Sequence, residues 1–172
     1  MLDERAKKLA EIVVDYSTEL NKEDILLVQA EKQFAEFAEE IARKAICRGA
    51  YTFVELVDIN KEKELIERCK DEELKAEAER LCKLAEKSTA RIRVDASENP
   101  LYLQEVPAEK IARYSEIVTK PFLDRICGNG KEFKGLKWNL VAYPSEADAK
   151  VAEMSLEKYS DFVFGATNID WK

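Results

Sequence analysis

The chain has 172 residues, a length typical of one globular domain. Its 28 basic and 35 acidic residues give a net charge of −7, which disfavours a nucleic-acid partner because such binding depends on clustered Lys and Arg. The sequence contains no histidine. This excludes a Ser-His-Asp or Cys-His catalytic system and an imidazole-bound metal within these residues.

The first half of the chain reads as alternating helices and strands. Apolar residues recur at helical spacing over residues 3–17 and again over 34–45, where the second helix ends near Gly49. The continuous apolar run Ile25 to Val28 and the β-branched and aromatic segment Tyr51 to Val57 predict strands. A strand, a helix and a second strand of this length predict a parallel pair.

The second half continues the alternation. Helical spacing recurs over residues 65–69 and 74–85, and strands are predicted at 90–94 and 136–143. Pro107 suits the first turn of a long helix that Pro121 should kink or divide, and residues 128–130 should form a turn. Ser145 and Ser155 are the expected caps of two last helices.

These elements predict a single α/β domain over residues 1–172. We expect three layers, with a mostly parallel, flavodoxin-like or doubly wound sheet of about four strands between helices. Cys47, Cys69, Cys82 and Cys127 include no CxxC pair and are expected as reduced thiols. The N-terminus has no apolar signal region and no apolar run is long enough to span a bilayer, so we expect a cytoplasmic protein without a membrane partner.

Ligand sites of open parallel sheets lie beyond the carboxyl ends of the strands. The segment Gln29 to Gln33 has no glycine there, which disfavours a phosphate-binding loop, and Gly128 to Lys131 is better explained as a turn. Asp95 lacks the acidic pair that a phosphoacceptor site requires. The sequence therefore disfavours nucleotide binding.

Two weaker patterns remain in this region. The carboxylates of Glu31, Glu55, Asp58 and Asp95 could converge as an acid and base pair, although chance and solvation explain them more simply. Trp138 and Tyr143, on the last predicted strand, favour a core or inter-domain contact over a stacking platform.

Several motifs together resemble the aminopeptidase T family of two-metal aminopeptidases. They are Ala142-Tyr143-Pro144-Ser145, the segment Met154 to Phe164 (MSLEKYSDFVF) and the ending Asp170-Trp171. Earlier similarities are Asp15 to Ser17, Asn21 to Asp24, Arg48-Gly49-Ala50, Glu98-Asn99-Pro100, Pro107 and Pro121, so the resemblance spans nearly the whole chain.

The resemblance implies an N-terminal scaffold domain of a metal-dependent aminopeptidase. Family members are longer, and their two divalent metal ions, such as zinc, cobalt or manganese, are held by glutamates, histidines and an aspartate in the second half. We therefore assign no catalytic, cofactor-binding or metal-binding residue to this chain, and expect it to be inactive alone. The implied partners are the catalytic C-terminal domain of the same polypeptide, a second copy in a homodimer and, for the complete enzyme, peptide substrates.

Two other interpretations remain open. The chain could be a stand-alone α/β binding or interaction module without enzyme activity, and whether the gene continues past Lys172 decides this. A receiver-like or nucleotide-binding protein is disfavoured by the missing loop chemistry. Under the domain interpretation, we expect Phe162, Val163, Phe164 and Trp171 to form an apolar patch that meets the catalytic domain or a second copy.

Overall fold

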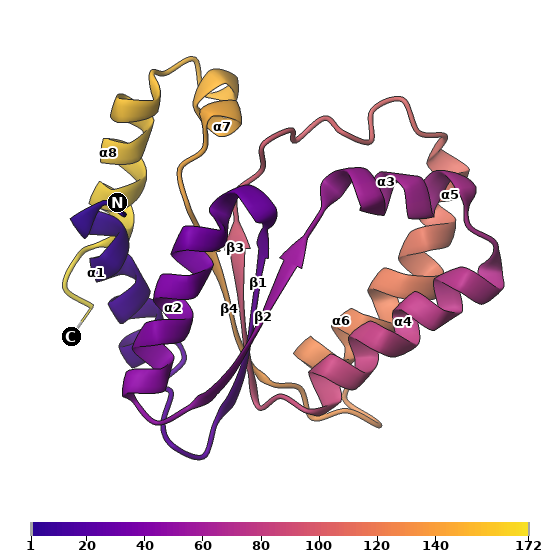
Figure 1. Ribbon diagram of the computed structural model, residues 1–172, viewed down its shortest axis with the longest axis horizontal. Helices are drawn as coiled ribbons and strands as arrows, with labels where there is room; N and C mark the ends of the chain where they lie inside the picture. Colours follow the sequence, from indigo (N-terminus) through magenta and orange to yellow (C-terminus); the bar gives the residue numbers. More distant parts are fainter. Residues whose placement is uncertain (1, 172) are drawn as a thin grey trace.

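The protein contains a four-stranded sheet between two groups of helices, as seen in a computed structural model that describes residues 2–171 (Figure 1). The strands are β1 (Ile25–Glu31), β2 (Tyr51–Val57), β3 (Ala90–Asp95) and β4 (Lys137–Ala142). All neighbouring strands are parallel, in the order β2-β1-β3-β4. The prediction of a three-layer α/β fold around a mostly parallel sheet is confirmed.

The helices divide between the two faces of the sheet (Figure 1). One group contains α1 (Glu4–Ile12), α2 (Ala35–Cys47) and α8 (Leu156–Thr167), which follows the short helix α7 (Glu146–Val151). The other group contains α3 (Ile59–Arg68), α4 (Asp71–Glu86), α5 (Ala108–Tyr114) and α6 (Lys120–Cys127). The segment after α8 returns to α1, where Trp171 stacks on Tyr16 and Asn168 donates to the Arg5 carbonyl.

The largest core fills the space between the sheet and the helices α1, α2 and α8. Leu26, Val28 and Ala30 of β1 point to this side because alternate residues of a strand share a face, and all three are fully buried. Tyr143 stacks on Phe37 with ring centroids 4.3 Å apart. This face of the sheet is therefore apolar and covered around β1, at about 1.5–3 kcal/mol for each large side chain removed from water.

The opposite face is covered less evenly. Helices α3 to α6 bury one apolar cluster largely among themselves, around Ile66, Leu74 and Val118, and this cluster contains no strand residue. A smaller cluster joins Leu27 of β1 to Phe122 and other residues of α4 and α6. The helices on this side therefore contact the sheet over part of its area and leave space elsewhere.

Some element boundaries differ from the predictions. β1 continues to Glu31, three residues beyond the predicted end, and is followed by a 3₁₀ turn, Lys32–Phe34. The first helix ends in a π-helical turn, Val13–Ser17. Pro107 precedes α5 as its N-cap and is not within its first turn.

Pro121 interrupts the helical pattern as predicted. A π-helical turn, Ser115–Thr119, separates α5 from α6, which has this proline at its start. Proline has no N–H for the preceding turn and its ring crowds the carbonyl four residues back. Widening the turn relieves that contact.

A buried carboxylate joins the strands at the amino end of the sheet. Asp24 accepts hydrogen bonds from the Thr89 hydroxyl at 2.8 Å, the Lys137 ammonium at 2.9 Å and the backbone N–H of Asn21 at 3.0 Å. Burial alone would raise the pKa of Asp24, but the hydrogen bonds from Lys137 and Thr89 outweigh it and hold the pKa below its usual value. Asp24 thereby ties the start of β1 to the starts of β3 and β4.

Candidate functional site

The sheet face beneath α3 to α6 carries polar side chains. In one row across the strands, Arg91 of β3 lies between Leu27 of β1 and Trp138 of β4. In the next row, Gln29 of β1 lies between Glu55 of β2 and Arg93 of β3. A parallel sheet covered on both faces normally presents apolar residues on both. The two arginines therefore mark where the helices stand away from the sheet.

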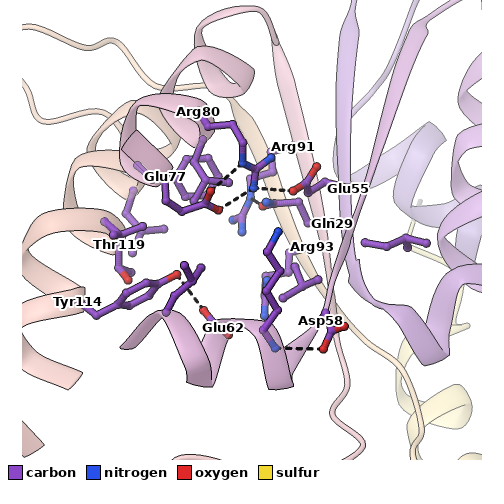
Figure 2. Close-up of a pocket in the computed structure, with 18 of the residues that line it drawn as sticks. Gln29, Glu55, Asp58, Glu62, Glu77, Arg80, Arg91, Arg93, Tyr114 and Thr119 are labelled. Carbon is purple, nitrogen blue, oxygen red and sulfur yellow. Dashed lines mark hydrogen bonds and ion pairs between the residues drawn. The ribbon is translucent and has the colours of Figure 1, made fainter. Parts of the chain in front are cut away.

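A cavity of about 610 Å³ lies between this face and the helices (Figure 2). This volume is in the range of small-molecule sites. The sheet contributes Gln29, Glu55, Arg91 and Arg93, and the edge strand β4 contributes Trp138 and Leu140. The remaining wall is partly apolar and comes from α3, α4 and the α5–α6 region, with Leu65, Leu81, Tyr114, Val118, Phe122 and Leu123.

Arg80 binds two of the carboxylates in this cavity. It forms two hydrogen bonds with Glu77, at 2.7 and 2.9 Å, and an ion pair with Glu55 at 2.8 Å (Figure 2). The hydrogen bonds that Arg80 donates to Glu77, and then its contact with Glu55, raise the pKa of Arg80 despite its partial burial. Both carboxylates of this group therefore have a cationic partner, although the group keeps one negative charge.

The other two acidic groups also have partners. Asp58 pairs with Lys32 at 2.7 Å and accepts the Asn60 and Lys61 N–H groups at the start of α3, so its pKa is lowered mainly by Lys32. Glu62 accepts hydrogen bonds from the hydroxyls of Tyr102 at 2.7 Å and Tyr114 at 3.3 Å.

The pKa values of both tyrosines that bind Glu62 are raised. Burial, followed by the Glu62 charge, raises the pKa of Tyr114. Burial, followed by the hydrogen bond to Glu62, raises the pKa of Tyr102. Both phenols stay protonated at neutral pH and can donate to the carboxylate.

The two arginines of β3 have no carboxylate partner of this kind. Arg91 is only 7% exposed, its Nε donates to the Gln29 side-chain oxygen at 2.6 Å, and its guanidinium lies 5.4 Å from the Phe122 ring centroid. Within residues 2–171, no carboxylate lies within 4.0 Å of Arg91 or Arg93. Burial, and then the positive charge of Arg93, lowers the pKa of Arg91 to about 10.

The predicted carboxylate candidates do not come together as an acid and base pair. Glu31 is buried and accepts the backbone N–H of Glu98 at 3.0 Å, whereas Glu55 and Asp58 are bound by Arg80 and Lys32. Asp95 is the last residue of β3 and is exposed. Each carboxylate has its own surroundings, so the contacts give that hypothesis no support.

Residues 128–130 lie in a loop that is closed around Asn129. The Asn129 side-chain oxygen accepts the backbone N–H groups of Lys131, Glu132 and Phe133 at 2.9–3.1 Å. Gly128 has a φ of +79°, which a residue with a side chain rarely adopts. The loop satisfies its own donors through Asn129.

The aromatic residues near the end of the chain differ from the expected exposed patch. Phe164 is 4% exposed and Val163 is also buried, so both belong to the interior, whereas Phe162 is 64% exposed. Trp171 is partly exposed and stacks on Tyr16 with centroids 6.0 Å apart. The expectation of a continuous apolar patch is therefore wrong for Val163 and Phe164, because α8 turns both inward and Phe164 packs edge-on against Tyr143 in the main core.

The part of the chain that the structure describes does not fit a two-metal centre. Residues 2–171 contain no group of three or more His, Cys, Asp or Glu side chains placed to hold a metal ion. Cys47, Cys69, Cys82 and Cys127 are all free. In the same residues no helix is both long and apolar enough to cross a membrane.

The sequence analysis missed the arginines of β3 and the role of Gln29 as the partner of Arg91. Arg91 and Arg93 alternate with Ala90, Ile92 and Val94 in a strand expected between two helical layers. That alternation of charged and apolar residues was the available signal, since only an incompletely covered face accommodates it.

These features define a three-layer α/β domain with a polar cavity on one face of its sheet. The family described as thermophilic metalloprotease (M29) matches residues 2–172, and the chain belongs to this family. This agrees with the family resemblance recognised from the motifs around Tyr143 and in Met154 to Phe164.

A solved structure, wild-type AmpT from Thermus thermophilus, is similar with a TM-score of 0.70 and 20% sequence identity. The match covers 96% of this chain and 43% of that chain, so this chain spans less than half the length of AmpT. At this identity the similarity shows the fold alone. The comparison with curated proteins gave no match.

Proposed function

We propose that this chain is the N-terminal scaffold domain of a metal-dependent aminopeptidase that removes N-terminal residues from peptides. One observation carries the proposal: the chain matches a metalloprotease family over residues 2–172 but spans only 43% of AmpT. The absence of histidine from the sequence supports it, because paired catalytic metals are commonly held by imidazole and carboxylate together.

In this proposal the chemistry belongs to a second domain of the same polypeptide. That domain supplies the ligands of two divalent metal ions, which activate water and polarise the scissile carbonyl when bound. The chain described here provides a rigid α/β support. We further propose a cytoplasmic location, a homodimeric assembly and a contact between α8, where Phe162 is exposed, and the catalytic domain.

The test compares two polypeptides: the 172-residue chain and the product of the complete reading frame. Each is supplied with zinc, cobalt or manganese, and metal content and hydrolysis of leucine p-nitroanilide are measured. We expect two metal ions and turnover only in the longer product. Metal-dependent turnover by the 172-residue chain would contradict the proposal.

The same experiment addresses the alternative of a stand-alone binding module. A reading frame that ends at Lys172, with no separate catalytic polypeptide that restores activity, would replace the scaffold proposal with that alternative. The cavity beneath α3 to α6 is the observation that favours a binding role.

A further inference from the structure

The cavity beneath α3 to α6 has a surplus of positive charge at its floor. All four of its carboxylates have partners: Glu55 and Glu77 pair with Arg80, Asp58 with Lys32, and Glu62 with two tyrosine hydroxyls. Arg91 and Arg93 have no carboxylate within 4.0 Å in residues 2–171. Burying an unpaired charge is costly unless something else compensates it.

The position of Gln29 determines which part of Arg91 is available. The Gln29 oxygen accepts from Nε at 2.6 Å, and no described residue accepts from the two Nη atoms. The Nη end of a guanidinium is a planar pair of donors that matches the two oxygens of a carboxylate. Gln29 is itself 3% exposed, so the arginine is fixed by a buried partner.

An apolar surface lies directly beside these arginines. Trp138 is the register partner of Arg91, and Leu140 is the register partner of Arg93, on the same face of the sheet. Trp138 is 53% exposed although it lines the cavity, so its ring is accessible to a ligand. A charged subsite and an aromatic subsite are therefore one strand apart.

We propose that this cavity binds a small organic carboxylate, with its carboxylate on Arg91 and Arg93 and its aromatic or aliphatic part against Trp138 and Leu140. A monoanion fits better than a phosphate dianion because four carboxylates line the same cavity and would repel the second charge. The proposal does not depend on the proposed peptidase function, since it concerns a site within this chain.

The test is a titration of the 172-residue chain with 3-phenylpropionate, its neutral twin 3-phenylpropanamide, and phenyl phosphate. The protein has two tryptophans, so Trp171→Phe leaves Trp138 as the reporter of binding by fluorescence. Trp171 does not line this cavity and stacks on Tyr16, a contact that Phe preserves. Calorimetry on the unmodified chain supplies an independent affinity.

We expect saturable binding of 3-phenylpropionate and at least roughly tenfold weaker binding of the amide, as loss of a charge-assisted pair predicts. Arg91→Met should weaken carboxylate binding to a similar extent, and Arg91→Lys should also weaken it, because Lys keeps the charge without the planar pair of donors. Arg68→Met is the matched control, since Arg68 is exposed and outside the cavity, and should leave affinity unchanged.

Thermal unfolding of each variant verifies that it is folded, and Arg93→Met provides a second removal of charge if Arg91→Met proves unstable. Three outcomes would overturn the proposal: no saturable binding of the carboxylate, equal binding of the amide, or unchanged affinity in folded Arg91→Met and Arg93→Met. Tighter binding of phenyl phosphate than of 3-phenylpropionate would overturn the assignment to a carboxylate.

Discussion

Arg91 is a buried cation that the fold compensates poorly, so removing its charge together with its hydrogen-bond partner should stabilise the protein. Its pKa is lowered to about 10 by burial and by Arg93. Because this pKa lies below that of the unfolded chain, the guanidinium is charged in both states at pH 7 and its burial opposes folding. The penalty diminishes only as pH rises through the folded-state pKa. Lowering the pKa to about 10 corresponds to about 3 kcal/mol against folding.

Arg91→Met alone should change stability little. It relieves the penalty but gives up the contact with the Phe122 ring, worth about 1 kcal/mol. It also leaves the buried Gln29 oxygen without its donor, at a cost of about 1–3 kcal/mol. Gln29→Leu alone removes the hydrogen bond from a charged group and should destabilise by about 1.5–3 kcal/mol.

The double variant Gln29→Leu, Arg91→Met removes the charge and leaves no unpaired acceptor. We expect it to be more stable than the unmodified chain by about 2 kcal/mol, which for a domain of this size raises the Tm by roughly 4–8 °C. Thermal unfolding followed by circular dichroism and urea denaturation both measure this, with Arg68→Met as the control. A double variant less stable than the unmodified chain would show that Arg91 supports the fold, and would refute the reasoning.

Three further results follow from the structure. Asp24→Ala should destabilise by about 2–4 kcal/mol at pH 7, because it removes three hydrogen bonds. Since the folded-state pKa of Asp24 is lowered, its contribution to stability is complete above about pH 4 and is lost as pH falls through that pKa. Urea denaturation should therefore find a smaller stability difference between Asp24→Ala and the unmodified chain at pH 2 than at pH 7. The control Glu23→Ala, at an exposed residue, should show no difference. By the same measurement, Phe164→Ala should lower the free energy of unfolding by about 3–5 kcal/mol and Phe162→Ala by less than about 0.5 kcal/mol. Equal effects of the two substitutions would contradict the assigned orientation of α8. Gly165→Ala should raise stability by about 0.5–1 kcal/mol, because this helical position has open space for a Cβ, and a lower Tm would contradict that geometry.

The sequence by itself determined the fold class and the family resemblance. Continuous apolar runs such as Ile25 to Val28 occur where a strand is covered on both faces, and alternation with helical periodicity then predicts a parallel sheet between helices. These signals are local or repeat at fixed spacing. They need no knowledge of which distant segments meet.

Only the tertiary structure decided which side chains form the site. Gln29 and Arg91 are 62 positions apart, and the pairing of β1 with β3 places them on one face of the sheet. Helical spacing puts Phe162 and Phe164 about 200° apart around α8, so one of them must face outward. Which one is buried depends on where α8 packs: in the structure Phe164 belongs to the core and Phe162 is exposed.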